Sequence, residues 1–189
     1  MIRTKFMRWF SYKPLEDLQF EHGKSLIMQN NSNDKLFMLG NFAVLGAPGL
    51  MAYRIVANYS LMGTFNFLFS SALLVGTSFF TKAWLGFTSS FVKEIHLVKS
   101  GKHIEITNYG IYNTKIKIKI SDILNPEESL QTKVKMQFFG TWVIETRQGD
   151  CFYVVQESQA YHKDVLKHIL KGIEIEVAPQ KDKSDIIDI

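Results

Sequence analysis

Residues that could do chemistry are few in this chain of 189 residues, and their spacing favours no known site. Cys151 is the single cysteine, so the chain can form neither an intrachain disulfide nor a cysteine-based metal site. The five histidines show no zinc-ligand spacing; they are His22, His96, His103, His162 and His168. Only His96 and His103, on neighbouring predicted strands, are placed to approach each other. We therefore expect no metal and no cofactor.

Catalytic signatures are also missing from the sequence. It contains no glycine-rich phosphate loop, no GxSxG motif and no Cys/His pair of a known spacing. Glu127 and Glu128 are adjacent, but their predicted loop lacks the apolar surroundings that would raise a carboxyl pKa. We therefore expect a protein that is not an enzyme.

Lysines make the strongest polar pattern. In TKIKIKI, residues 114–120, they alternate with isoleucines, so the isoleucines should face a core and the lysines should face outward. KVKMQFF, residues 133–139, alternates in the same way. We expect a contact with anionic lipid or an acidic partner through Lys82, Lys115, Lys117, Lys119, Lys133 and Lys135. A solvated sheet face explains the alternation equally well.

The overall charge argues against nucleic acid as a partner. The formal net charge is only +4, whereas nucleic-acid binders carry a strong cluster of basic residues. A mild surplus of this kind is compatible with a membrane surface or an acidic protein.

The element that must position everything else is the apolar stretch Leu36–Thr81. Its only charged residue is Arg54, so it contains two segments long enough to cross a bilayer, each needing about 20 apolar residues. Ala57, Asn58, Tyr59 and Ser60 lie where the turn is expected. Because the spans contain no Asp, Glu, Lys or His, they offer no proton relay and no histidine ligand for haem.

Small residues in these spans predict close helix packing. Gly40, Ala43 and Ala47 share a face of the first span, and Ala72 and Gly76 share a face of the second. We expect these residues to contact other transmembrane helices. Pro48 should kink the first span, and Asn66 should form a hydrogen bond across the hairpin.

Residues 1–35 form a basic segment. Arg3, Lys5, Arg8 and Lys13 precede the first acid, Glu16, a composition typical of a mitochondrial targeting segment or of an interfacial helix. A solvated start with scattered aromatic residues is the third alternative. Basic residues flank the hairpin on both sides, so the positive-inside rule places both termini on the cytoplasm-like side, the matrix in a mitochondrion.

The C-terminal part, residues 91–172, predicts an α+β domain. Alternating segments at 91–98, 103–107, 114–120, 133–139, 141–146 and 151–155 predict an antiparallel meander of about six strands. A packed amphipathic helix follows, with Ser158 as its N-cap and Gly172 just beyond its end. Residues 173–189 form a charged tail. The fold class is a membrane α+β protein, a two-helix transmembrane hairpin followed by this domain.

This layout resembles the mitochondrial inner-membrane family of transmembrane proteins 70, 186 and 223. The likeness lies in the hairpin Leu36–Thr81, in VKEIHLVKSGKHIEITNYG directly after it, and in WVIETRQGDCFYVV before the final helix. It covers residues 36–172. The resemblance implies a β-rich matrix domain and a non-catalytic role in assembly or support of respiratory-chain or ATP-synthase complexes.

Two functional hypotheses follow. The first is a non-catalytic subunit or assembly factor of an inner-membrane complex, with other subunits and membrane lipids such as cardiolipin as partners. The second is a membrane-anchored lipid- or ligand-binding module that uses the basic sheet face or a pocket between sheet and helix. A small enzyme with an unrecognised pocket is a distant third.

Overall fold

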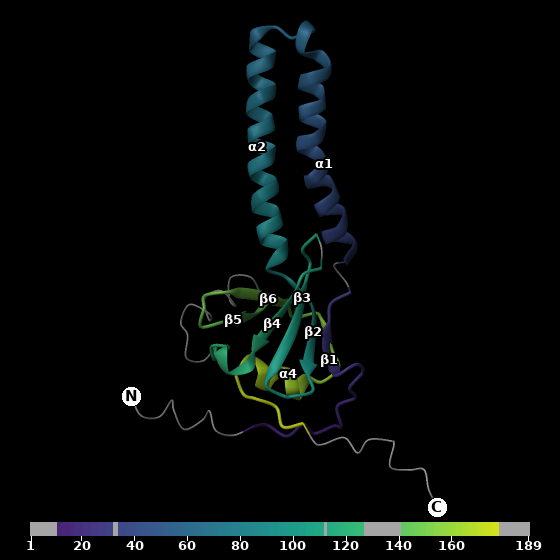
Figure 1. The fold of residues 1–189 in the computed structure, drawn as a ribbon, viewed down its shortest axis with the longest axis vertical. Coiled ribbons are helices and arrows are strands. Elements are labelled where there is room, and N and C mark those ends of the chain that lie inside the picture. Colours follow the sequence, from purple (N-terminus) through teal and green to yellow (C-terminus); the bar gives the residue numbers. More distant parts are fainter. Residues whose placement is uncertain (1–10, 32–33, 112, 127–140, 178–189) are drawn as a thin grey trace, which may run out of the picture.

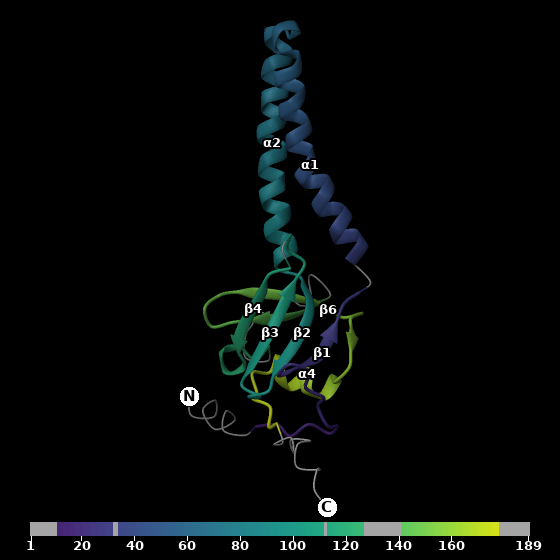
Figure 2. The same ribbon diagram turned by 45° about the vertical axis from the view of Figure 1, so that its right-hand side comes forward.

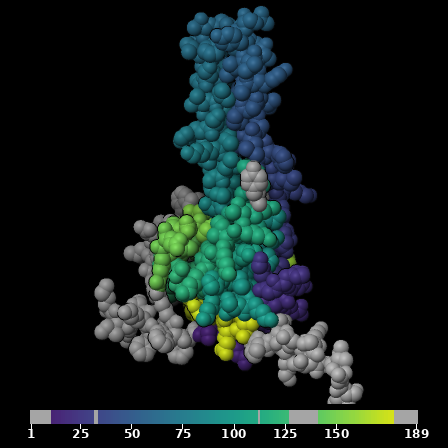
Figure 3. All heavy atoms as spheres, in the orientation of Figure 1, coloured from purple at the N-terminus to yellow at the C-terminus, as the bar shows by residue number. Residues whose placement is uncertain are grey.

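The computed structural model describes residues 11–31, 34–111, 113–126 and 141–177. Two long helices project side by side from one end of a small domain of strands (Figure 1). The predicted combination is confirmed: two long apolar helices, an antiparallel sheet and a C-terminal helix. The space-filling view shows the helices standing clear of the domain for most of their length (Figure 3).

The helical hairpin consists of α1 (Asp34–Asn58), the short 3-10 turn η2 (Tyr59–Leu61) and α2 (Thr64–Ser89). Both helices extend beyond the predicted spans. At the tip, α1 includes Ala57 and Asn58, which were expected in the turn. There the Asn58 side-chain amide donates a 3.0 Å hydrogen bond to the carbonyl of Arg54, one turn earlier in the helix.

Pro48 does not interrupt α1, which is continuous through it. Figure 2 shows the part of α1 nearer the sheet diverging from α2, whereas the two helices lie close together towards the tip.

The main sheet has five antiparallel strands in the order β4-β3-β2-β1-β7. The strands are β1 (Lys24–Gln29), β2 (Val92–Val98), β3 (His103–Asn108), β4 (Lys115–Lys119) and β7 (Gln159–Ala160). The predictions for β2, β3 and β4 are confirmed. Their inward isoleucines and leucines form the core together with residues of β1.

Strand β1 corrects the sequence analysis, which placed its residues in a separate N-terminal segment. Its burial does not alternate cleanly, because a register shift between Leu26 and Met28 leaves both Ile27 and Met28 fully buried. Since β1 pairs with β2, the helical hairpin is an insertion between two neighbouring strands of one sheet. Both ends of the hairpin are therefore anchored in the same sheet.

A second, two-stranded sheet pairs β5 (Thr141–Glu145) with β6 (Cys151–Val155). Both strands were predicted, but the expected single meander is wrong: β6 meets the main sheet through a bridge from Tyr153 to Phe91. The 3-10 turn η3 (Ile120–Asp122) follows β4. The strand predicted at 133–139 lies outside the described residues.

Helix α4 (Lys163–Leu170) closes the core with Val165, Leu166 and Ile169. Gly172 ends it as predicted, with φ +72° and a hydrogen bond from its N–H to the carbonyl of Ile169. The predicted N-cap, Ser158, is wrong. Residues 159–160 add a short strand to the main sheet instead, and the helix begins after His162.

The described N-terminal residues also belong to the domain. The ring of Tyr12 stacks on His168 with centroids 3.5 Å apart, and its hydroxyl donates a 2.9 Å hydrogen bond to Asp164. Tyr12 also bridges to Ile175, which is buried, so the predicted tail does not begin at residue 173. These contacts lie at the end of the domain opposite the helices (Figure 2).

Candidate functional site at the helix–sheet junction

The junction between the hairpin and the domain is held by an aromatic cluster. Phe37 of α1, Phe91 between α2 and β2, and Tyr109 after β3 are all buried. The ring centroid of Phe37 lies 4.4 Å from that of Tyr109 and 5.5 Å from that of Phe91. Each ring comes from a different element, so the cluster fixes the orientation of the hairpin on the sheet.

Asn41 connects three elements by hydrogen bonds. Its side-chain nitrogen donates to the carbonyl of Tyr109 over 3.2 Å, and its side-chain oxygen accepts a 3.0 Å hydrogen bond from the indole of Trp84. One amide thus joins α1 to α2 and to the loop after β3. Thr81 adds a second link between the helices by donating to the carbonyl of Val44 over 2.9 Å.

The base of α1 is polar. Asp34 forms a 3.1 Å ion pair with Lys93 of β2, and the hydroxyl of Tyr109 donates to the carbonyl of Asn30. Burial raises the pKa of the Tyr109 hydroxyl far above its ordinary value, and the neighbouring Asp34 carboxylate raises it further. Tyr109 is therefore a neutral hydrogen-bond donor in this environment.

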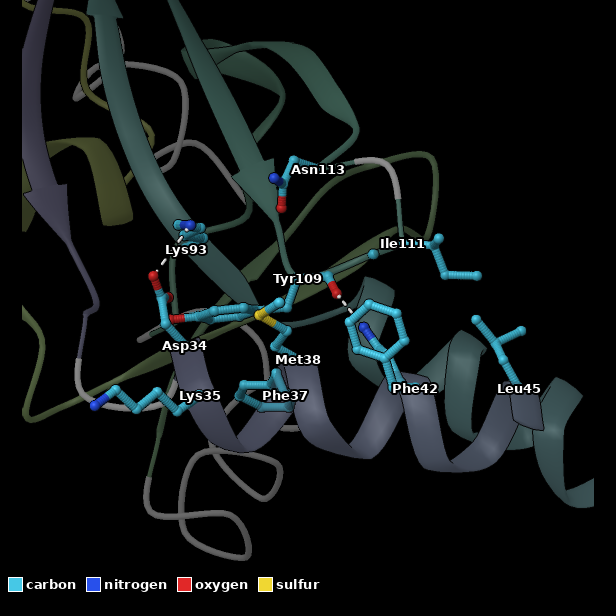
Figure 4. Close-up of a pocket in the computed structure, with 12 residues that line it drawn as sticks. Asp34, Lys35, Phe37, Met38, Phe42, Leu45, Lys93, Tyr109, Ile111 and Asn113 are labelled. Carbon is cyan, nitrogen blue, oxygen red and sulfur yellow. Dashed lines mark hydrogen bonds and ion pairs between the residues drawn. The ribbon is translucent and has the colours of Figure 1, made fainter. Parts of the chain in front are cut away.

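A cleft of about 380 Å³ opens beside these residues, between α1 and the loop that joins β3 to β4 (Figure 4). Met38, Phe42 and Leu45 line its helical wall, and Ile111 of the loop faces Leu45. Asp34, Lys35 and Lys93 line the other end, and Asn113 lines the cleft from the loop side. This lining, apolar at one end and charged at the other, suits a ligand that has an apolar part and one polar end and that undergoes no reaction in the cleft.

The predicted small residues separate into two groups. A Cβ at Gly40 would lie 2.6 Å from Trp84, so Gly40 serves the contact between α1 and α2, and Ala47 is half-buried. Ala43, Ala72 and Gly76 are exposed. Asn66 is also exposed, so the predicted hydrogen bond across the hairpin is wrong; Asn41 and Thr81 make the cross-hairpin bonds.

The predicted basic face is present in part. Lys115, Lys117 and Lys119 are exposed on β4, and Lys82 is exposed on α2, far from them along the chain. Lys117 pairs in register with Glu105, but the carboxylate of Glu105 is held by Lys24 at 2.7 Å. Lys133 and Lys135 lie outside the described residues, so the grouping of all five strand lysines stays a prediction.

The histidines do not assemble a metal site in the described part of the chain, where no group of three His, Cys, Asp or Glu side chains could hold a metal ion. His96 and His103 lie on the same side of the sheet, with Glu105 between them in the register. Burial lowers the pKa of His96 despite the opposing effect of Glu94 and Glu105, which favours the neutral imidazole.

Comparison with known proteins finds no family model and no curated protein that matches the chain. The junction therefore has to be interpreted from its own geometry. The sequence analysis named neither Asn41 nor Trp84 as a site residue. It did not bring them together, because the residues that meet at the junction come from four separate segments.

Proposed function

We propose that this protein is a non-catalytic subunit or assembly factor of a multi-subunit membrane complex, anchored by its helical hairpin. The observation that carries the proposal is the exposure of the hairpin. Across α1 and α2 only Phe37, Ser70 and Thr88 are buried, although both helices are long and apolar enough to span a membrane. A helix that is apolar all round needs either a protein core or lipid around it, and the described domain does not cover these helices.

Apart from the charged base of α1, the hairpin carries two charged residues, and these two indicate its position in the bilayer. The hydrogen bond from Thr81 to Val44 aligns the helices, so Lys82 lies roughly level with Ala43. Arg54 is further along α1, towards the tip. Basic side chains extend towards the nearest interface, so the bilayer midplane falls between these two levels, near Pro48.

A hydrocarbon core of about 30 Å accommodates about 20 helical residues, or roughly ten on each side of Pro48. The boundaries then lie near Leu39 and Tyr59. Trp84, hydrogen-bonded to Asn41, comes close to the first boundary, and Tyr59 lies at the second. Aromatic residues with a polar group are the ones expected at these two depths.

The attachment of the hairpin supports a docking role. Because the hairpin is inserted between β1 and β2 and locked by Asn41, its orientation is tied to that of the domain. A partner that binds the helices would thereby fix the position of the domain, and a partner that binds the domain would fix the position of the helices. The exposed Ala43, Ala72 and Gly76 give partner helices room for close approach.

The mitochondrial inner membrane is the location we propose, with both termini in the matrix and a respiratory-chain or ATP-synthase complex as the partner. Support comes from the basic flanks of the hairpin, the basic N-terminal segment and the family resemblance of the layout. The hairpin geometry requires that its two ends lie on one side of the membrane.

A membrane-anchored lipid-binding module is the second candidate. The observation that favours it is the row of exposed lysines on β4, whose nearest acid across the strand pair, Glu105, is already held by Lys24. The two functions predict species of different size on a native gel. A lipid-binding module migrates as a small species, whereas a subunit or assembly factor migrates with a large complex.

Native-gel migration after mild solubilisation tests the proposal. We expect the tagged protein in a large complex and expect Ala72→Leu combined with Gly76→Leu to shift it to a small species. Val75→Leu, at an exposed position that already holds a large side chain, is the matched control and should not shift. Migration of the unaltered protein as a small monomer or oligomer would contradict the proposal.

A further inference from the structure

The side chains that line the cleft at the base of α1 change in polarity along the helix. Lys35, Met38, Phe42 and Leu45 recur at intervals of three and four residues, so they form one face of the helix. Figure 4 shows Ile111 across from Leu45 at one end and the Asp34–Lys93 ion pair at the other. The wall therefore changes from charged to apolar along the helix axis.

The charged end carries a surplus of one positive charge. Asp34 neutralises Lys93 at 3.1 Å, whereas Lys35 is exposed and forms no ion pair within the described part of the chain. A ligand with a single negative charge matches this surplus. A phosphodiester has one such charge, whereas a phosphate monoester would place a second one near the Asp34 carboxylate.

The apolar end leaves large side chains exposed. Phe42 is 66%, Leu45 42% and Ile111 43% exposed. In the bilayer position derived above, the boundary of the hydrocarbon core falls near Leu39. Lys35 and Lys93 then lie at the depth of the headgroups, and Phe42 and Leu45 lie at the depth of the acyl chains.

We propose that this cleft binds one anionic glycerophospholipid from the leaflet next to the domain. Its phosphate contacts Lys35 and Lys93, and one acyl chain lies against Phe42, Leu45 and Ile111. This inference rests on the proposed membrane insertion of the hairpin. It names a ligand site that differs from the basic face of β4, because none of the β4 lysines lines the cleft.

Native mass spectrometry of the full-length protein, released from nanodiscs of phosphatidylcholine doped with phosphatidylglycerol, tests the site. We expect one phosphatidylglycerol retained per chain. Lys35→Gln should lower the retained fraction at least fivefold, the factor that corresponds to the roughly 1 kcal/mol contributed by one basic residue near an anionic lipid surface. Lys35→Arg should restore retention.

Lys99→Gln is the matched control, since Lys99 is also exposed and basic but lies outside the cleft. It should lower retention less than twofold. Ile111→Ser tests the apolar end and should lower retention as Lys35→Gln does. Equal loss in Lys99→Gln, no loss in Lys35→Gln, or displacement of the lipid by glycerophosphate would overturn the inference.

Extraction of the same variants from membranes with alkaline carbonate separates this inference from the proposed function. We expect every variant to stay in the membrane. Resistance to extraction without a retained phosphatidylglycerol would refute the lipid site and leave the anchor intact, whereas release of the unaltered protein would refute the anchor and the lipid site with it.

Discussion

The indole N–H of Trp84 and the side-chain oxygen of Asn41 form a 3.0 Å hydrogen bond between the two long helices. The same Asn41 amide donates to the backbone of Tyr109 in the domain. Asn41 therefore contributes to the alignment of the hairpin, together with Thr81, and to its attachment to the sheet, together with the aromatic cluster at the junction. This junction accounts for how an exposed pair of helices keeps a fixed orientation.

Replacing Asn41 with Leu should weaken the junction. The change leaves the Trp84 indole and the Tyr109 carbonyl without these partners, at a cost of about 1–3 kcal/mol in the free energy of unfolding. Denaturant unfolding in detergent micelles measures it. Asn66→Leu, at an exposed position on α2, is the control and should change stability by less than about 0.5 kcal/mol. Equal losses in the two variants would argue against a special role for Asn41.

Gly40 should not tolerate a side chain. A methyl group there would lie 2.6 Å from the ring of Trp84, so Gly40→Ala should force the helices apart and lower stability by about 1–3 kcal/mol. Gly46→Ala has no neighbour within 4 Å and should be neutral or slightly stabilising, because alanine favours the helix. Thermal unfolding of both variants in the same detergent compares them. The account is wrong if Gly46→Ala proves the more damaging change.

Tyr109 should make stability sensitive to alkali. Burial, with Asp34 as a further cause, raises the pKa of its hydroxyl in the folded protein above the unfolded value of about 10. The folded state thus holds this proton more tightly, so its contribution is complete below about pH 10 and is lost as pH rises above that value. Tyr109→Phe should show a shallower alkaline loss than the unaltered protein in pH-dependent unfolding. Parallel curves for the two proteins would refute this.

Asp164 should make the stability of the fold sensitive to acid. Partial burial opposes ionisation, but hydrogen bonds from the Leu15 N–H and the Tyr12 hydroxyl outweigh it and hold the pKa of Asp164 below its ordinary value. Its contribution is therefore present above the unfolded pKa of about 3.9 and is lost as pH falls through the folded one. Asp164→Asn should flatten the acid side of the stability curve. An unchanged acid side would show that the N-terminal segment is not held by this residue.

Sequence patterns predicted the parts of the fold whose periodicity is regular. The alternation in β2, β3 and β4 and the two long apolar helices fall in this class. Strand β1 was missed because its bulge buries both Ile27 and Met28. The Gln159–Ala160 strand is too short to show the two-residue periodicity of a strand. Ser158, which precedes it, is of a residue type that often caps helices, and this led to the wrong N-cap prediction.

The junction was harder to predict than the strands for a physical reason. The contact among Asn41, Trp84 and Tyr109 forms only because the hairpin closes and the sheet positions its ends. The spacing of these residues in the sequence does not indicate that they meet. The available signal was Asn41 itself, an uncharged polar residue in an otherwise apolar part of the first span. The close approach at Gly40 was correctly indicated by its size, but its neighbour turned out to be Trp84 within the same hairpin.

Cysteine labelling in sealed vesicles tests the central claim most directly, namely that the hairpin crosses the membrane and returns. In a Cys151→Ser background, Ser60→Cys marks the tip of the hairpin and Gln148→Cys marks an exposed turn of the domain. We predict that a membrane-impermeant maleimide labels the two positions from opposite sides of the membrane. Labelling of both positions from the same side would contradict the account.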